Sequence, residues 1–301
     1  MMLLAMSSSL LAQNPTETAP SFGDGSPDSL YQISTLNHLY WITQNSSEWD
    51  KHYIQTANID AFSTSSWDSN EGFSRIGNNS TKFTGSYDGD GYTINGLTID
   101  RSSTSYIGLF GYTDGATIQD LGVTNVNIKG SRYVGGLVGW VKGNSTISNC
   151  YSTGSVGETS RDVGGLVGWV RDNSTISNCY STCSVTGTVV GGLAGWVKDN
   201  STISNCYSTG SVTGTGNYAG GLAGYINATA SVINCYSTGS VTDTTSFNGG
   251  FVGRVSDNPT VSNCFWDTQT SGHGSSAGGA GSVGKTTADM KTASTFYDAD
   301  W

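Results

Sequence analysis

The chain has 301 residues and a net charge of -10, with 12% charged residues, 42 glycines and four prolines. Low charge and abundant glycine favour many short strands joined by tight turns, and they argue against a helical protein. The acidic balance leaves no basic stripe for phosphates, which excludes nucleic acid as the expected partner and disfavours electrostatic docking on anionic lipid.

The first residues are typical of a targeting segment. Met2 to Ala12 form a short apolar run that ends in a small residue, which predicts the remnant of a secretory signal over residues 1–12. No Lys or Arg precedes this run, so the signal is incomplete at its start. No other segment approaches the ~20 apolar residues that a membrane span needs, and we expect no transmembrane segment.

Residues 13–82 predict an N-terminal capping region, because a stack of strands exposes unpaired edges at its ends. Apolar residues recur at near-helical spacing over residues 30–42, which indicates a short helix. Large aromatic side chains in this region could seal the first coil: Trp41, Trp49, Phe62, Trp67 and Phe73.

Residues 83–265 consist of repeats. Five similar copies begin at residue 133, and five cysteines mark their period in steps of 29, 27, 29 and 29 residues. A weaker copy precedes them, with Leu121 in the cysteine position, and residues 83–99 resemble an opening coil. One copy is too short to bury its own apolar face, so the copies must stack on one another. The sequence therefore predicts an all-β fold, a parallel β-helix or β-solenoid of about seven rungs.

Positions within the repeat predict two outward-facing aromatic rows. Strand residues alternate between faces, and the position that holds Trp in three copies holds Arg254 in the last, so it should face solvent as an exposed ladder. A second row should face outward after the strand phase resets at an Asn turn. The predicted ligand-binding residues are Tyr112, Trp140, Trp169, Trp196 and Tyr225 in the first row, and Tyr151, Tyr180, Tyr207 and Tyr236 in the second.

Two further columns are predicted to be structural. Stacked Asn side chains can hydrogen-bond along a ladder and tolerate unusual backbone angles at a turn. Cysteine packs as a small hydrophobe; the parallel side chains favour buried free thiols, although stacking would bring them within bridging distance. The columns are Asn149, Asn178, Asn205, Asn234 and Asn263, and Cys150, Cys179, Cys206, Cys235 and Cys264.

The recurrent G-G-L-V/A-G segment, found at Gly135–Gly139, Gly164–Gly168, Gly191–Gly195 and Gly220–Gly224, resembles the GLUG motif family. With the Asn-Cys-Tyr-Ser-Thr-Gly element, the resemblance covers residues 106 to about 265. GLUG repeats occur in exported bacterial proteins, including adhesin-like chains and non-catalytic parts of immunoglobulin A-specific metalloproteases. The resemblance implies a secreted or cell-surface location and a repeat scaffold, but it implies no reaction.

Residues 266–301 predict a Gly-rich loop followed by a C-terminal cap. Gly and Ser dominate residues 271–284, which is typical of a flexible loop. Residues 285–297 predict a short helix, with Thr286 and Asp289 as its capping pair. Residues 279–286 match the phosphate-binding pattern G-x-x-x-x-G-K-[ST], but no buried strand precedes them, so we interpret them as a loop that enters this helix.

No convincing catalytic constellation is present, and we predict a non-catalytic protein with no cofactor and no metal. The three histidines have no metal-ligand spacing. Asp88 and Asp90 form a carboxylate pair of the kind that glycosidases use, but their D-G-D-G order is more typical of tight turns.

The predicted function is adhesion or ligand binding through the stacked aromatic strip, with a glycan or a surface protein as partner. Two alternatives remain open. One is a polysaccharide lyase or glycosidase of β-helical fold, and the other is an inert stalk of a larger surface protein.

Overall fold

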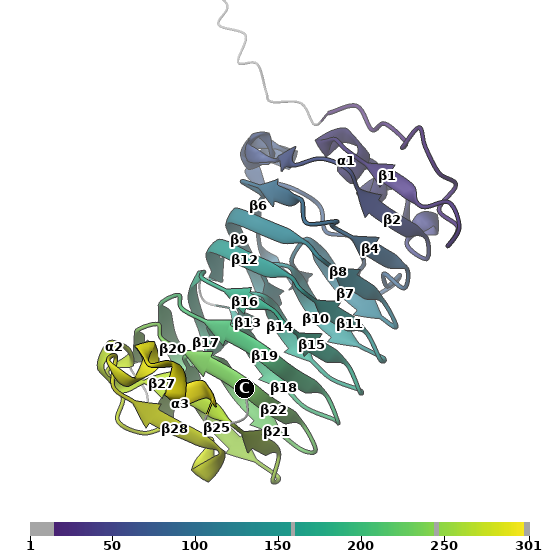
Figure 1. Ribbon diagram of the computed structural model, residues 1–301. Coiled ribbons are helices and arrows are strands. Elements are labelled where there is room, and N and C mark those ends of the chain that lie inside the picture. The colour runs from purple at the N-terminus through teal and green to yellow at the C-terminus, as the bar shows by residue number, and fades with distance from the viewer. Residues whose placement is uncertain (1–14, 158–159, 244–246, 298–301) are drawn as a thin grey trace, which may run out of the picture.

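The protein is a rod of stacked β-coils. The computed structural model describes residues 15–157, 160–243 and 247–297. Successive coils follow one another along a single axis, from the N-terminal cap to the C-terminal cap (Figure 1). Equivalent strands of neighbouring coils pair in parallel and in register, for example Tyr207 with Tyr236. The fold is the predicted parallel β-solenoid, with about six coils.

One side of the rod is a sheet to which each coil contributes one strand. Trp140 in this sheet lies between Tyr112 and Trp169 of the neighbouring coils. In order along the rod, the strands are β7 (Phe110–Asp114), β10 (Val138–Lys142), β14 (Val167–Val170), β18 (Ala194–Val197), β21 (Ala223–Asn227) and β25 (Val252–Ser256).

The remainder of each coil belongs to a larger sheet that bends at the Asn positions. Two strands, β19 (Thr202–Ser208) and β22 (Ser231–Ser237), run through the bend. The strands that lie before it are β8 (Thr117–Gln119), β11 (Thr146–Ser148), β15 (Thr175–Ser177) and β26 (Thr260–Ser262). Those that follow it are β9 (Gly122–Gly135), β12 (Tyr151–Gly157), β13 (Arg161–Gly164), β16 (Tyr180–Ser181), β17 (Ser184–Gly191), β20 (Val212–Gly220), β23 (Val241–Asp243), β24 (Asn248–Gly249) and β27 (Cys264–Asp267).

Columns of apolar side chains fill the interior, as the repeat predicts. Each fully buried Leu or Val contributes about 1.5–3 kcal/mol relative to an exposed one. Val255 in the last coil is only half-buried, unlike its counterparts in earlier coils. The two columns predicted to face the core contain Leu137, Leu166, Leu193, Leu222 and Phe251, and Val141, Val170, Val197 and Ile226, all of which are fully buried.

The G-G-L-V/A-G segment requires glycine because the backbone passes close to its neighbours there. A Cβ atom on Gly165 would collide with the carbonyl oxygen of Gly192 and with the hydroxyl of Ser181. Ser152 from the preceding coil donates a hydrogen bond to the carbonyl oxygen of Gly165, at 2.7 Å. The motif therefore forms a tight corner that is held by a buried serine hydroxyl.

The N-terminal cap contains the predicted helix and also starts the parallel stacking. Helix α1 (Leu36–Gln44) begins at Thr35, whose hydroxyl accepts a hydrogen bond from the His38 backbone N–H at 3.2 Å. Residues before it form strand β1 (Tyr31–Ile33) instead of helix, and β1 pairs with β2 (His52–Gln55). The remaining elements are η1 (Ser46–Glu48), β3 (Ile59–Asp60), η2 (Phe62–Ser66), η3 (Asp68–Asn70), β4 (Ser86–Asp88), β5 (Thr93–Asn95) and β6 (Thr98–Ile107).

Most of the aromatic residues predicted to seal this end do so. Trp49, Trp67 and Phe73 are buried, and Trp41 packs against the core while partly exposed. The expectation for Phe62 was wrong, because its side chain is 53% exposed. Phe62 opens a short 3₁₀ helix at the surface, where its ring lies over Gly96 rather than under the first coil.

The C-terminal cap differs from the sequence prediction. Thr286 and Asp289 do form a capping pair, with the Thr286 hydroxyl 2.8 Å from a carboxylate oxygen of Asp289. The predicted short C-terminal helix is present but shorter than residues 285–297, because Lys285 ends strand β28 (Ser282–Lys285) and a 3₁₀ turn precedes the helix. The helical elements of this cap are α2 (Thr268–Ser271), η4 (Gly279–Gly281), η5 (Asp289–Lys291) and α3 (Ala293–Tyr297).

Candidate functional site

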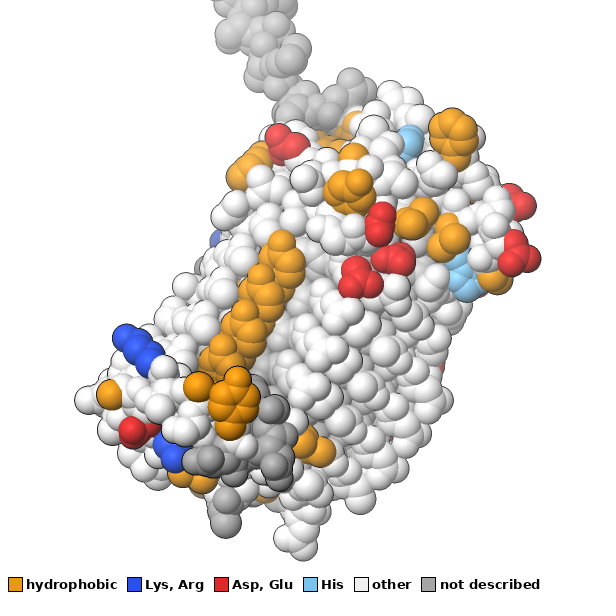
Figure 2. All heavy atoms as spheres, viewed as in Figure 1, with side chains coloured by type: hydrophobic (Ala, Val, Ile, Leu, Met, Phe, Trp, Pro, Cys, Tyr) orange, Lys and Arg blue, Asp and Glu red, His pale blue; other side chains and the backbone are white. Residues whose placement is uncertain are grey.

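The second predicted aromatic row is a straight stack of four tyrosines, which we call the tyrosine column. Neighbouring ring centroids lie 4.8 to 4.9 Å apart, and neighbouring ring planes differ by only 2° to 4°. Each ring is half-buried. Figure 2 shows a straight stripe of hydrophobic side chains on this face of the solenoid, which runs up to the C-terminal cap. The column consists of Tyr151, Tyr180, Tyr207 and Tyr236.

Stacking determines which part of each tyrosine can meet a ligand. The flat faces pack against the next ring, so the column presents ring edges and phenol hydroxyls to solvent. Burial raises the pKa of Tyr180 and Tyr207, so both phenols are protonated and can donate hydrogen bonds at neutral pH. The column is therefore a row of hydrogen-bonding groups with apolar edges between them.

Hydroxyl-bearing residues flank the tyrosine column on both sides. The outward positions of these strands in four consecutive coils hold Thr, Ser, Asn or Tyr, with Ile233 as the exception, and none of them is charged. Ser211 donates a hydrogen bond to Ser184 of the preceding coil at 3.1 Å. The two rows that follow the column along the strands are Thr153, Thr182, Thr209 and Thr238, and Ser155, Ser184, Ser211 and Ser240. We call this surface the hydroxyl face.

The first predicted row, which we call the tryptophan column, also stacks. Ring centroids lie 4.7 Å apart for Tyr112 and Trp140, 4.5 Å for Trp140 and Trp169, and 5.1 Å for Trp169 and Trp196. The column lies outside the apolar core, as predicted, and ends at Tyr225. The prediction of an exposed ladder was wrong for Tyr112 and Trp169, which are only 4% and 7% exposed, while the other three members are half-buried.

A second layer of side chains covers the tryptophan column. Tyr106 stacks on Trp140 at 5.4 Å, and Tyr133 stacks on Trp169 at 4.9 Å. Arg171 lies over the Trp169 ring at 5.2 Å, in a cation–π contact. The burial raises the pKa of Tyr112 to about 12.

Sequence reasoning missed this covering layer. Its signal was the tyrosine that stands two residues before the first glycine of the segment in three copies: Tyr106, Tyr133 and Tyr218. The same position holds Asp162 in one copy and Val189 in another. This variation hid the layer, because a column with changing residues does not stand out as a ladder.

The asparagine column forms the predicted corner. All five residues have φ between 52° and 54°, the left-handed region that Asn tolerates better than most residues. Asn205 donates to the side-chain oxygen of Asn178, and Asn234 donates to that of Asn205, each at 3.3 Å. The corner resets the strand phase, which turns the cysteines inward and the tyrosines outward. The column consists of Asn149, Asn178, Asn205, Asn234 and Asn263.

The five predicted cysteines lie one above the next in the core, and they are free thiols, as is Cys183. The Cys179 thiol donates to the carbonyl oxygen of Ser177 at 3.1 Å and accepts from the Cys150 backbone N–H at 3.3 Å. Burial raises the pKa of the Cys150 and Cys206 thiols. These contacts make the column a packing element. Its members are Cys150, Cys179, Cys206, Cys235 and Cys264.

The carboxylates considered for catalysis lie at the end of strand β4 and in the turn that follows it. One oxygen of Asp88 accepts the Asp90 backbone N–H at 2.8 Å, and the other accepts from the Gln119 side chain at 2.9 Å. Asp90 has φ of 47°, which is typical of a turn. No group of three or more His, Cys, Asp or Glu side chains in the described ranges could hold a metal ion.

The glycine-rich segment near the C-terminus adds no phosphate site. Residues 279–286 form a 3₁₀ turn and strand β28, which is not the strand–loop–helix arrangement that binds nucleotide phosphates. Residues 1–12, predicted as a signal remnant, lie outside the described residues. Among residues 15–157, 160–243 and 247–297, no helix is long and apolar enough to cross a membrane.

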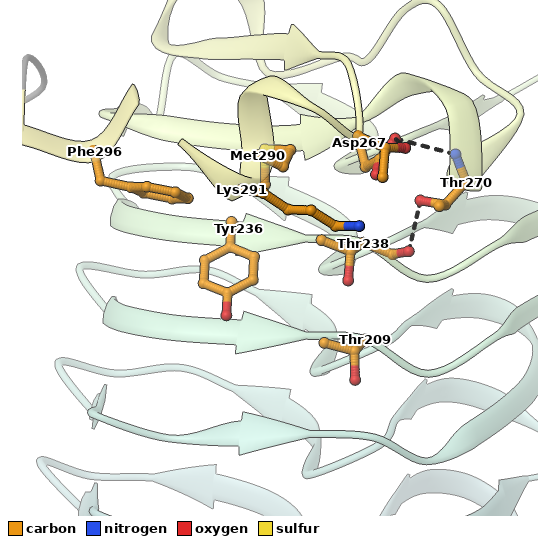
Figure 3. A pocket seen from close by; sticks show the side chains of 9 residues that line it. Thr209, Tyr236, Thr238, Asp267, Thr270, Met290, Lys291 and Phe296 are labelled. Atoms are coloured by element: carbon orange, nitrogen blue, oxygen red, sulfur yellow. Dashed lines mark hydrogen bonds between the residues drawn. The ribbon is translucent and has the colours of Figure 1, made fainter. Parts of the chain in front are cut away.

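The tyrosine column leads to a pocket of about 590 Å³ beside the C-terminal cap. Tyr236, Met290 and Phe296 form an apolar wall, and the Phe296 ring meets the Tyr236 ring edge-on at 5.9 Å. Figure 3 shows the Lys291 side chain pointing toward Thr238. The other lining residues are Thr209, Asp267, Thr270 and Thr287.

Comparison with known proteins identifies the repeat. The family model described as "The GLUG motif" matches residues 130–157, 159–190, 186–213 and 215–242. These four matches lie in consecutive coils, so residues 130–242 carry four repeats of the GLUG motif, as the sequence predicted.

Two relatives share the repeat region. Halomucin from Haloquadratum walsbyi is 40% identical over 145 residues, which cover 46% of this chain but 2% of halomucin. A protein provisionally named as a Gly-rich membrane protein, from Evansella cellulosilytica, is 32% identical over 127 residues, or 41% of this chain and 14% of that protein. The chain therefore spans a small part of each of these relatives.

The fold has a counterpart among solved structures. A crystal structure from Bacteroides ovatus, provisionally described as an immunoglobulin A1 protease, superimposes with a TM-score of 0.71 over 89% of this chain and 87% of that one. The sequences are 21% identical, so the likeness concerns the fold alone.

Proposed function

We propose that this protein is a non-catalytic, secreted or cell-surface repeat module that binds an extended glycan along the hydroxyl face. The observation that carries this proposal is the tyrosine column, a straight row of half-exposed phenols on an uncharged face. The names of the two relatives, halomucin and a Gly-rich membrane protein, support a surface location.

The regular spacing favours a linear polymer over a folded partner. A ligand that lies along the rod meets the same set of Tyr, Thr and Ser hydroxyls in every coil, at intervals of 4.8 to 4.9 Å. Sugars carry both donors and acceptors on every unit and can match such a row. The absence of charge from this set makes a neutral glycan a better match than a charged polymer.

Of the two aromatic columns predicted to bind a ligand, we propose that only the tyrosine column does so. The tryptophan column was expected to share in binding, but Tyr106, Tyr133 and Arg171 cover its first rings. Lys198 lies over Trp196, and Arg254 lies over Tyr225. We therefore assign it a structural role and assign binding to the tyrosine column. Because Asp88 is held by two turn contacts, nothing in its environment favours the glycosidase alternative over binding.

Calorimetry with linear neutral hexasaccharides tests the proposal, with β-1,4-glucan, β-1,3-glucan and β-1,4-mannan oligomers as the panel. We expect at least one to bind, and the variant Tyr180→Ala/Tyr207→Ala to weaken that binding at least about tenfold, or ~1.4 kcal/mol. Tyr225→Ala, in the tryptophan column, is the matched control and should leave affinity unchanged. Equal affinity of Tyr180→Ala/Tyr207→Ala and Tyr225→Ala would show that the hydroxyl face is not the binding site. If no oligomer binds to the wild-type protein, the proposal is contradicted.

A further inference from the structure

We propose that the pocket beside the C-terminal cap binds the terminal sugar of a neutral glycan chain, so that the protein recognises chain ends. This inference rests on the proposed function, because it takes the glycan to lie along the tyrosine column. It adds a second site, with its own residues, at one end of that column.

The hydroxyl face is closed at this end. After Tyr236, the next coil carries Phe265 in the same position, and Phe265 is buried. Phe296 from α3 packs edge-on against both rings, at 5.6 Å from Phe265 and 5.9 Å from Tyr236. A polymer that follows the column toward the cap therefore meets α3, and its last unit lies at the pocket.

The apolar wall suits the C–H groups of a sugar ring. Tyr236, Met290 and Phe296 line one side of the pocket, and apolar surface predominates over polar surface in its lining. The volume of about 590 Å³ falls within the ~300–1,000 Å³ of typical small-molecule sites. The pocket is thus large enough for one sugar unit together with the start of the next.

The polar side of the pocket contains a positioned carboxylate. Asp267 is 2% exposed, and its Oδ1 accepts hydrogen bonds from the backbone N–H groups of Gln269 and Thr270 and from the Thr287 hydroxyl. No donor from the described residues reaches its Oδ2. The three contacts fix the carboxylate in one orientation, and Oδ2 can accept from a ligand hydroxyl.

Opposite charges on the polar side favour a neutral ligand. Lys291 and Asp267 both line the pocket, and Figure 3 shows the Lys291 ammonium extending to the side of the pocket where Asp267, Thr238 and Thr270 lie. A neutral hexose can donate one hydroxyl to the carboxylate and accept at another from the ammonium. An anionic sugar would face Asp267, and a cationic sugar would face Lys291.

Variants of the pocket residues test the contribution of the pocket to glycan affinity independently of the tyrosine column. Asp267→Asn keeps an acceptor for the cap of α2 but removes the charge, and Phe296→Ala opens the wall. For the hexasaccharide that binds best, we expect either change to weaken affinity at least about fivefold, and Asp257→Asn, a turn carboxylate that does not line the pocket, to have no effect. Unchanged affinity for Asp267→Asn and Phe296→Ala overturns the end site.

Blocked ligands test recognition of the chain end. The same hexasaccharide is offered with its reducing end converted to the alditol, or with its non-reducing end blocked. We expect one blocked form to lose affinity about tenfold and the other to bind as before. Equal binding of both forms overturns end recognition.

The set of variants that lose binding distinguishes failure of the end site from failure of the proposed function. Loss of binding in Tyr180→Ala/Tyr207→Ala alone supports the hydroxyl face without the pocket. Loss in Asp267→Asn and Phe296→Ala alone supports a pocket that works without the column, and this overturns the proposed function. The intrinsic stability of each variant, measured by urea unfolding, distinguishes loss of a contact from loss of the fold.

Discussion

The two aromatic columns stack alike but have opposite surroundings. The tryptophan column is covered by a layer of Tyr and Arg side chains, with Tyr133 and Arg171 over Trp169. The tyrosine column has a row of threonines on one side and the asparagine column on the other, and its rings stay half-exposed. An outward-facing aromatic ladder can therefore stabilise a solenoid from outside its core. Whether such a ladder can bind depends on what its neighbours leave open.

Replacing Trp169 tests the structural side of this comparison and has the largest expected effect. Trp169→Ala removes a buried ring that stacks on Trp140, Tyr133 and Trp196, so we expect a loss of about 3–5 kcal/mol of stability. Urea unfolding followed by circular dichroism measures it. Tyr180→Ala, as the control in the other column, should cost less because its ring is half-exposed. A larger loss of stability in Tyr180→Ala than in Trp169→Ala would contradict the structural role assigned to the tryptophan column.

Removing one phenol hydroxyl tests whether the tyrosine column binds glycan through its hydroxyl groups. Tyr180→Phe keeps the ring stacked between Tyr151 and Tyr207 but deletes a donor, so we expect glycan affinity to fall about threefold with unchanged stability. Titration calorimetry against wild type checks the affinity, and thermal unfolding checks the stability. If affinity is retained, ring edges rather than hydroxyls contact the ligand.

Asp162, a buried carboxylate in the covering layer, is expected to have the smallest effect, which is a change in how stability depends on pH. Asp162 is fully buried, and burial raises its pKa although Arg132 and Arg161 lie 3.1 and 3.5 Å away. A carboxyl whose folded pKa is raised contributes most below its unfolded pKa of about 3.9, and that contribution is lost as pH rises through the folded value.

The difference in unfolding free energy between wild type and Asp162→Asn isolates this group. We expect wild type to lose stability relative to Asp162→Asn as pH rises from about 4 to 7, by a small amount. Denaturant unfolding at several pH values measures the difference. A difference that moves the other way would show that the arginines outweigh burial.

The repeat made much of this architecture predictable. Five copies with the same spacing place Cys150 and its equivalents in one column, and Leu121 in the same position indicated that the column is buried. The Asn corner followed from the conflict between strict alternation and the cost of a buried amide. Both inferences use positions whose residue type hardly changes between copies.

The parts that were wrong depend on contacts that the repeat does not encode. Burial of Trp169 comes from Tyr133 and Arg171, which lie at positions that vary between copies. The C-terminal helix starts later than its local pattern indicated, and the end of the predicted Gly-rich loop is strand β28, which pairs with the open edge of β27. The pocket at Phe296 could not be foreseen either, because it forms only where this segment folds back on Tyr236.

The coils differ in length in a segment away from the tyrosine column. Partners differ by 29 positions at Val156 and Val185 but by 27 at Val163 and Val190, so the shorter coil loses two residues between these points. The strands that carry the tyrosines remain in unbroken register across the same coils. Length changes in that segment therefore leave the stacking of the tyrosine column unchanged. Duplication of one unit would extend it by a single phenol, which makes the repeat number a direct measure of how long a polymer the protein can follow.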